Sequence, residues 1–237
     1  MNITLESVSL AIATASTLEL VVAIVATIVA TILLFRLLFA SKGQSLPRPD
    51  LALFLGASGA GKSALFYHWS MPGSQVKTVT SQSPNRGRVL QTCPLEIIDF
   101  PGHASLWHGA VALLPRAGRI VYLIDATADT AALKAIAENL FDLLTAKALR
   151  SDTRLMICRS KTDAKAAKSE SAILKILNSE LELLRNSRAK ALDASEANWL
   201  GVDDEKFDLK SHCPVDVTFG ESSVKTGNVV DIETFLQ

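Results

Sequence analysis

The 237-residue chain has few cysteines, no excess of charge of either sign and no internal repeat. Its three cysteines, Cys93, Cys158 and Cys213, show no C-x-x-C spacing and no paired histidine. They predict reduced thiols in a cytosolic domain rather than a disulfide framework or a metal site. Basic and acidic residues number 24 each, so the formal net charge is zero. We therefore expect no direct nucleic-acid binding, since bulk positive charge is what holds a nucleic acid.

Charge is also missing from a long apolar run near the N-terminus. Residues 20–35 carry no charged side chain, and the apolar stretch resumes after Arg36 and ends at residue 40. A membrane-spanning helix needs about 20 largely apolar residues, and an arginine near one end can extend to the headgroups. We expect one transmembrane helix over residues 18–40, preceded by a non-cytosolic segment, 1–17.

Two alternatives compete with a transmembrane helix. A cleaved signal peptide would carry basic residues before a shorter apolar core, whereas Glu6 and Glu19 precede this run. A buried core helix would show a polar stripe, which so long a run lacks.

The flanks of the apolar run set its orientation. Arg36, Lys42 and Arg48 follow the run, and no lysine or arginine precedes it. The positive-inside rule then puts the C-terminal side in the cytosol. Residues 41–50 have the composition of a linker, and residues 51–237 form the expected cytosolic domain.

A glycine-rich loop follows the first apolar run of that domain. The pattern G-x-x-x-x-G-K-S lies between a strand-like segment, 51–55, and a helix-like segment, 63–69. This setting predicts a phosphate-binding loop, in which curled backbone N–H groups and a helix N-terminus bind phosphate, and a chance glycine-rich turn is the alternative. Lys62 would contact the β- and γ-phosphates, and Ser63 would ligand Mg²⁺. The nucleotide-binding residues predicted here are Gly56, Ala57, Ser58, Gly59, Ala60, Gly61, Lys62, Ser63 and Ala64.

Further strand-like runs alternate with helix-like segments. This order predicts an α/β fold in which a mostly parallel sheet carries helices on both faces. Ligands of such sheets bind beyond the carboxyl ends of the strands. The expected strands are 94–99, 119–125, 155–158 and 215–219, and the expected helices are 130–150, 164–192 and 229–236. A polar loop, 75–90, and an irregular insertion, 193–214, complete the chain.

One strand-like run ends in the pattern D-x-x-G, from Asp99 to Gly102. The carboxylate can hold Mg²⁺ through water, and the glycine N–H is placed to bind a γ-phosphate. The pattern alone is a common turn. Its position at a strand end after a phosphate loop favours the metal site.

A second pattern, Ser160 to Asp163, predicts the base. Asp163 can accept two hydrogen bonds from the N1–H and amine of guanine, which adenine does not offer, and the stem of Lys161 would stack along the base. An exposed polar turn is the alternative. Ser223 and Val224 would close the purine pocket, mostly through backbone N–H groups. GTP is therefore favoured over ATP.

Together these motifs resemble the Ras/Arf-type small GTPases from residue 51 to the C-terminus. Within that group the chain is similar to the beta subunits of the signal recognition particle receptor. Residues 99–106 match their D-x-P-G-H-x-S-L, residues 221–225 are similar to E-C-S-A-K, and an apolar N-terminal segment is present. The chain departs at Ser160, where most such proteins have asparagine, and at Val224, where they have alanine.

The resemblance implies a protein of the endoplasmic reticulum membrane that binds GTP and Mg²⁺. In the GTP form it would dock the longin-like N-terminal domain of the receptor's alpha subunit through its switch regions, for cotranslational protein targeting. Thr80 is the best match for the switch threonine that ligands Mg²⁺, with Ser81 beside it and Thr78 as an alternative.

His103 occupies the place where many GTPases have the glutamine that orients water, and a residue facing the partner is an equal alternative. No arginine is recognisable as a catalytic finger in the same chain, so we expect hydrolysis that is slow or assisted by a partner. An Arf-like trafficking GTPase, a pseudo-GTPase scaffold with little nucleotide, and a membrane-anchored P-loop kinase or ATPase are the competing functions.

Overall fold

The structure is a computed structural model that describes residues 22, 24–32, 49–73, 81–191, 200–202 and 205–237. The chain divides into two compact units, Met1–Leu46 and Pro47–Gln237. In the first unit the described residues, 22 and 24–32, are helical. Among the residues described, no helix has both the length and the apolar character that crossing a bilayer requires. Most of the predicted span, 18–40, lies outside the described residues.

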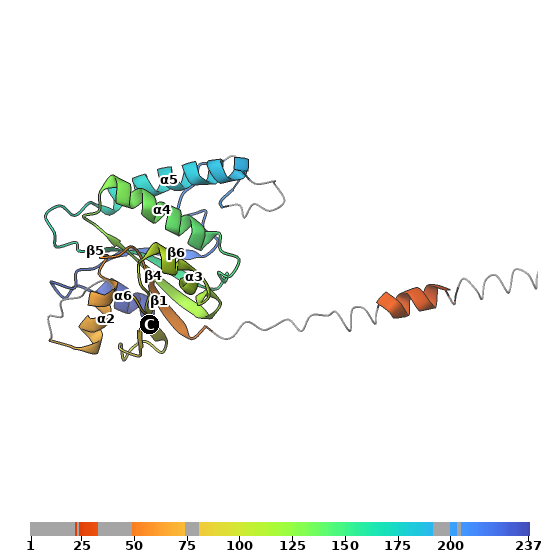
Figure 1. The fold of residues 1–237 in the computed structure, drawn as a ribbon, viewed down its shortest axis with the longest axis horizontal. Coiled ribbons are helices and arrows are strands. Elements are labelled where there is room, and N and C mark those ends of the chain that lie inside the picture. The colour runs from red at the N-terminus through yellow and green to blue at the C-terminus, as the bar shows by residue number, and fades with distance from the viewer. Residues whose placement is uncertain (1–21, 23, 33–48, 74–80, 192–199, 203–204) are drawn as a thin grey trace, which may run out of the picture. The chain divides into compact units, whose positions relative to one another are not determined.

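The second unit is built on one six-stranded sheet (Figure 1). The strands follow the order β2-β3-β1-β4-β5-β6, and all neighbours are parallel except β2 and β3. The prediction of a mostly parallel sheet is confirmed. The strands are β1 (Leu51–Leu55), β2 (Asn85–Gly87), β3 (Glu96–Asp99), β4 (Ala117–Asp125), β5 (Arg154–Ser160) and β6 (Asp216–Glu221).

Helices cover both faces of the sheet. In Figure 1, α4 and α5 lie together on one face, and α2 and α6 lie on the other. The short helix α3 contributes Ala110 to the core that α4 and α5 cover. The helices are α2 (Lys62–Ser70), α3 (Trp107–Val111), α4 (Thr130–Leu144), α5 (Glu170–Ala191) and α6 (Val230–Leu236), with 3₁₀ turns at Ala104–Leu106 (η1) and Leu114–Arg116 (η2).

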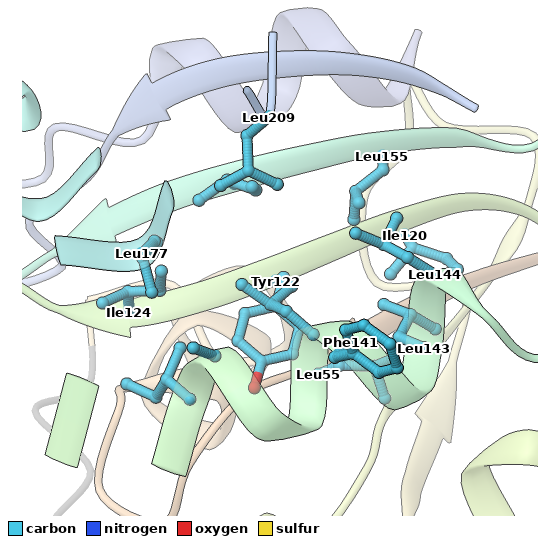
Figure 2. Close-up of a cluster of buried hydrophobic side chains, with 14 of the residues drawn as sticks. Leu55, Ile120, Tyr122, Ile124, Phe141, Leu143, Leu144, Leu155, Leu177 and Leu209 are labelled. Atoms are coloured by element: carbon cyan, nitrogen blue, oxygen red, sulfur yellow. The ribbon is translucent and has the colours of Figure 1, made fainter. Parts of the chain in front are cut away.

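Side chains alternate between two cores along each central strand. Leu53 and Tyr122 belong to the core under α4 and α5, whereas Phe54 and Val121 belong to the core under α2 and α6. Figure 2 shows part of the first core, where Tyr122 packs beside Phe141 of α4. Because both faces are covered, the middle positions of these strands are apolar, and they appear in the sequence as uninterrupted apolar runs such as 51–55 and 120–124.

Two segments differ from the expectation. Strand β2 lies inside the stretch predicted as a polar loop, 75–90, because its three residues become a strand only by pairing with β3. The described residues of the insertion, 200–202 and 205–214, contain no helix or strand. They are held against α5 by the buried side chain of Arg185, which donates to the carbonyl oxygens of Val202 (3.1 Å) and Glu205 (2.6 Å).

Candidate functional site

The predicted motifs meet at the carboxyl ends of the parallel strands β1, β3, β4, β5 and β6, which all lie on the same side of the sheet. A cavity of about 340 Å³ opens at these strand ends. It reaches from the glycine-rich loop to the start of the predicted base-reading segment. Its lining residues are Ser58, Gly59, Gly61, Lys62, Ser63, Ala64, Ser81, Phe100, Pro101, Gly102 and Lys161.

The glycine-rich loop turns tightly between β1 and α2. Gly56 has φ 133°, and a Cβ there would lie 2.2 Å from the carbonyl oxygen of Leu123 on the neighbouring strand. Gly61 has φ 92° at the residue before α2. These positions need glycine, because L side chains rarely adopt such φ values. The backbone N–H of Ala60 closes the loop on the carbonyl oxygen of Ala57 at 3.3 Å.

Lys62 lies across this loop with its ammonium group inside. The side chain is 5 % exposed, and Nζ donates to the carbonyl oxygens of Gly56 (2.8 Å) and Ala57 (2.7 Å). Burial lowers the pKa of Lys62 to about 8, against the opposing attraction of Asp99. A buried ammonium group that is hydrogen-bonded only to neutral carbonyl oxygens is stabilised strongly by a nearby anion, so the loop is suited to phosphate.

Ser63 and Asp99 form the candidate metal site. Ser63 Oγ donates to Asp99 Oδ2 at 2.6 Å and lies 3.3 Å from Ser81 Oγ. Asp99 is 1 % exposed, and its Oδ1 is buried with no hydrogen-bond partner in the part of the chain that the structure describes. An unpaired buried carboxylate oxygen is costly, and hydroxyl and carboxylate oxygens are ligands of Mg²⁺. These residues therefore fit Mg²⁺, whereas the predicted ligand Thr80 and its alternative Thr78 lie outside the described residues.

Gly102 packs directly on the glycine-rich loop. A Cβ at this position would lie 2.5 Å from the backbone nitrogen of Ser58 and 2.6 Å from the carbonyl oxygen of Gly56. No side chain fits there unless one loop moves away from the other. The glycine of the D-x-x-G pattern is thus required by close approach of two backbones.

His103 lies next to these loops and is exposed. Its Nδ1 accepts from the backbone N–H of Ser105 (3.3 Å) and lies 2.8 Å from Ser105 Oγ, so the ring caps the 3₁₀ turn η1. His103 and Gly56 also line a small cavity of about 20 Å³. The geometry supports a structural capping role beside the glycine-rich loop, and the catalytic role remains a prediction.

The base-reading segment is tied to the glycine-rich loop. Ser160, which is 4 % exposed, places Oγ 2.7 Å from the carbonyl oxygen of Ala60 and 3.1 Å from that of Ile124. The hydroxyl therefore joins the end of β5 to the glycine-rich loop. Lys161 follows in a left-handed conformation (φ 57°), and its Nζ pairs with Asp125 Oδ2 at 2.6 Å.

Asp163 meets the last predicted loop. Ser223 Oγ donates to Asp163 Oδ1 at 2.6 Å, and Lys225 Nζ lies 3.6 Å from Oδ2. The hydrogen bond from Ser223 lowers the pKa of Asp163, so the carboxylate remains an acceptor at neutral pH. Val224 instead packs against the core under α2 and α6. The described lining of the large cavity includes Lys161 and stops short of Asp163.

Two residues of the site were missed by sequence reasoning. Asp125, at the end of β4, accepts from Thr127 through its backbone N–H (2.9 Å) and Oγ1 (2.7 Å) in addition to pairing with Lys161. Asn85, on β2, donates to Asp99 Oδ2 at 2.8 Å. The position of Asp125 at a strand end was a usable signal. Asn85 gave none, because its contact depends on a strand register that the sequence does not reveal.

The comparisons with known proteins agree with this arrangement. The family model "Signal recognition particle receptor beta subunit" matches residues 48–215. The mouse signal recognition particle receptor subunit beta is 31% identical over 207 residues, which cover 78% of this chain and 74% of the mouse protein.

Solved structures give the same result. The structure of the mammalian signal recognition particle receptor contains a chain that is 29% identical, with a TM-score of 0.65 over 78% of this chain and 97% of that one. The receptor protein SRb from Chaetomium thermophilum, solved with GDP and Mg, shares the fold with 20% identity, a TM-score of 0.62 and coverage of 80% and 96%. The chain belongs to the family of signal recognition particle receptor beta subunits.

Proposed function

We propose that this protein is a membrane-anchored GTP-binding switch that, in its GTP form, docks the receptor's alpha subunit at the endoplasmic reticulum. The observation that carries the proposal is the hydrogen bond from Ser160 to the carbonyl oxygen of Ala60. It joins the loop suited to phosphate to the segment suited to guanine, so that one nucleotide can span both.

Each predicted residue has a role in this proposal. The backbone of residues 56–61 and the Lys62 ammonium group bind the phosphates, and Gly102 N–H binds the γ-phosphate. Asp163 reads guanine, with Ser223 holding its carboxylate and Lys161 lying along the base. Ser160 and Val224 support these loops through the contacts described above, and Ala64 lines the cavity.

Magnesium would be held by Ser63, by a switch hydroxyl and, through water, by Asp99. Of the predicted switch hydroxyls, Ser81 lies 3.3 Å from Ser63 and is the candidate that the described residues support, with Thr80 adjacent in sequence. The ion supplies positive charge that neutralises the phosphate oxygens. Hydrolysis is slow or assisted by a partner, because the chain offers His103 in place of a water-orienting glutamine.

Membrane attachment and the partner follow from the family and from the apolar run. Relatives carry the name of the receptor's beta subunit, and one similar chain comes from a structure of the mammalian signal recognition particle receptor. Residues 18–40, which contain the uncharged stretch 20–35, are the proposed anchor, with the nucleotide site in the cytosol.

Nucleotide binding tests the core of the proposal. The full chain in detergent should bind fluorescent GDP and GTP and discriminate against ATP. Lys62→Ala should abolish binding, whereas the matched control Lys165→Ala, in the exposed turn after the base-reading segment, should not. Asp163→Asn should lose guanine binding by about 10- to 100-fold and gain xanthine nucleotide binding, because the amide can donate to the carbonyl oxygen that replaces the guanine amine.

Affinity capture tests the partner. Protein loaded with GTP or GDP is incubated with detergent-solubilised membranes, and bound proteins are identified. Recovery of the receptor's alpha subunit with GTP only is the expected result. Coat or tether proteins would indicate a trafficking GTPase instead, and capture that is equal without any nucleotide would indicate a scaffold.

A further inference from the structure

Asp99 is held by a polar contact that none of the predicted motifs contains. Asn85 lies opposite Asp99 in the antiparallel pairing of β2 with β3. The amide Nδ2 of Asn85 donates to Asp99 Oδ2 at 2.8 Å, and Ser63 Oγ donates to the same oxygen at 2.6 Å. Two donors therefore meet one carboxylate oxygen.

The other oxygen of this carboxylate, Oδ1, differs from Oδ2 in its hydrogen bonding. Asp99 Oδ1 is buried and has no hydrogen-bond partner within the described parts of the chain. Since Oδ2 is bound from two sides, the carboxylate cannot rotate without losing both bonds. Oδ1 therefore remains available to accept from a metal-bound water or to contact the ion itself.

We propose that Asn85 is a positioning residue for Mg²⁺, a role that rests on the proposed function. It does not touch the ion or the nucleotide. It would hold Asp99 Oδ2 beside Ser63, and Oδ1 would be the carboxylate oxygen left to accept from a Mg²⁺-bound water. Second-sphere donors of this kind set the orientation of ligands and commonly change metal affinity by 10- to 100-fold.

The orientation of the Asn85 amide is itself determined. Tyr67, on α2, has its hydroxyl 3.4 Å from Asn85 Oδ1. A reversed amide would put Oδ1 against the carboxylate, and two acceptors repel each other. The donor end is therefore directed at Asp99.

The contact also depends on strand pairing. β2 has only three residues, it is the edge strand of the sheet, and Asn85 reaches Asp99 because the two are register partners. A slip of one residue would turn the Asn85 side chain to the other face of the sheet. The metal site is thus linked to the pairing of β2 with β3.

The test measures dissociation of fluorescent GDP from the full chain in detergent, over a range of Mg²⁺ concentrations and in EDTA. In Asn85→Ala, the Mg²⁺ concentration that half-maximally slows dissociation should rise by about 10- to 100-fold. The rate in EDTA should stay within about twofold of wild type, because Asn85 acts only through the metal ligand. Asn85→Leu, which keeps side-chain bulk and strand propensity while lacking the donor, should behave in the same way.

Arg86→Ala is the matched control, since Arg86 is the next residue of β2, is exposed and pairs with Ile98 on the other face. Its Mg²⁺ dependence should equal that of wild type. If the Asn85 variants keep the wild-type Mg²⁺ dependence, or release GDP faster by the same factor in EDTA, the positioning role is wrong. Wild-type protein that does not bind GDP would instead refute the proposed function.

Discussion

Replacing Ser160 by alanine tests whether the phosphate and base segments act as one unit. The hydroxyl has a single proton and two carbonyl acceptors, at 2.7 Å on Ala60 and 3.1 Å on Ile124. Alanine removes that donor, and the acceptor carbonyl loses this hydrogen bond. A net loss of about 1 kcal/mol is expected from one buried neutral hydrogen bond, with up to about 2 kcal/mol if the carbonyl stays dry.

Two readouts follow from this magnitude. A loss of 1 kcal/mol lowers the melting temperature by about 2–4 °C in a domain of this size. The affinity for GDP should fall by at most about 5-fold for a loss of about 1 kcal/mol, or about 30-fold for about 2 kcal/mol, because the hydrogen bond sets an upper limit on what holding the two segments together contributes to binding. Thermal unfolding without nucleotide and equilibrium titration with fluorescent GDP measure the two effects separately.

Thr153→Val provides the matched control. Thr153 is equally buried, and its Oγ1 donates to the carbonyl oxygen of Ala117 at 2.8 Å. This bond lies at the amino ends of β5 and β4, away from the candidate site. This variant should lose similar stability with no change in GDP affinity. Equal behaviour of the two variants would refute the tether, and a loss above about 100-fold in Ser160→Ala would mean that the hydroxyl contacts the nucleotide directly.

Three further predictions concern other parts of the domain. Gly102→Ala should reduce GTP affinity more than GDP affinity in equilibrium titrations. The added Cβ, 2.5 Å from the Ser58 nitrogen, would force apart the two loops that are proposed to bind the γ-phosphate, and equal losses would contradict this role. Arg185→Leu should lower the free energy of unfolding, measured by denaturant, by about 2–4 kcal/mol, because the charged donors to the carbonyl oxygens of Val202 and Glu205 are lost. GDP binding should stay unchanged. Burial raises the pKa of the Cys158 thiol to about 12 from an ordinary 9.0. Between these pH values the folded state binds more protons than the unfolded state, so the free energy of unfolding falls as pH rises. Chemical denaturation should show a smaller fall in Cys158→Ala, and an identical pH profile would contradict this reasoning.

Much of the candidate site was predictable because its motifs are local. The glycine-rich loop needs its glycines, Lys62 and Ser63 within eight consecutive residues, and the strand before it and the helix after it are encoded in the same stretch. The central strands were predictable because burial on both faces leaves uninterrupted apolar runs such as 119–125. From these, the parallel order implied one ligand-binding edge.

The remaining features arise from contacts between residues far apart in the chain. Ser160 was recognisable only as a departure from asparagine, and its bond to Ala60, 100 residues earlier, needs β1, β4 and β5 assembled side by side. Strand β2 and the contact of Asn85 with Asp99 exist only through the β2–β3 register. The amino-acid sequence by itself determined which loop is shaped to bind an anion and which strands are central, because those features depend on local conformation and burial. The tertiary structure decided which side chains hold the candidate site residues in place, because hydrogen-bond partners across strands are set by register and packing.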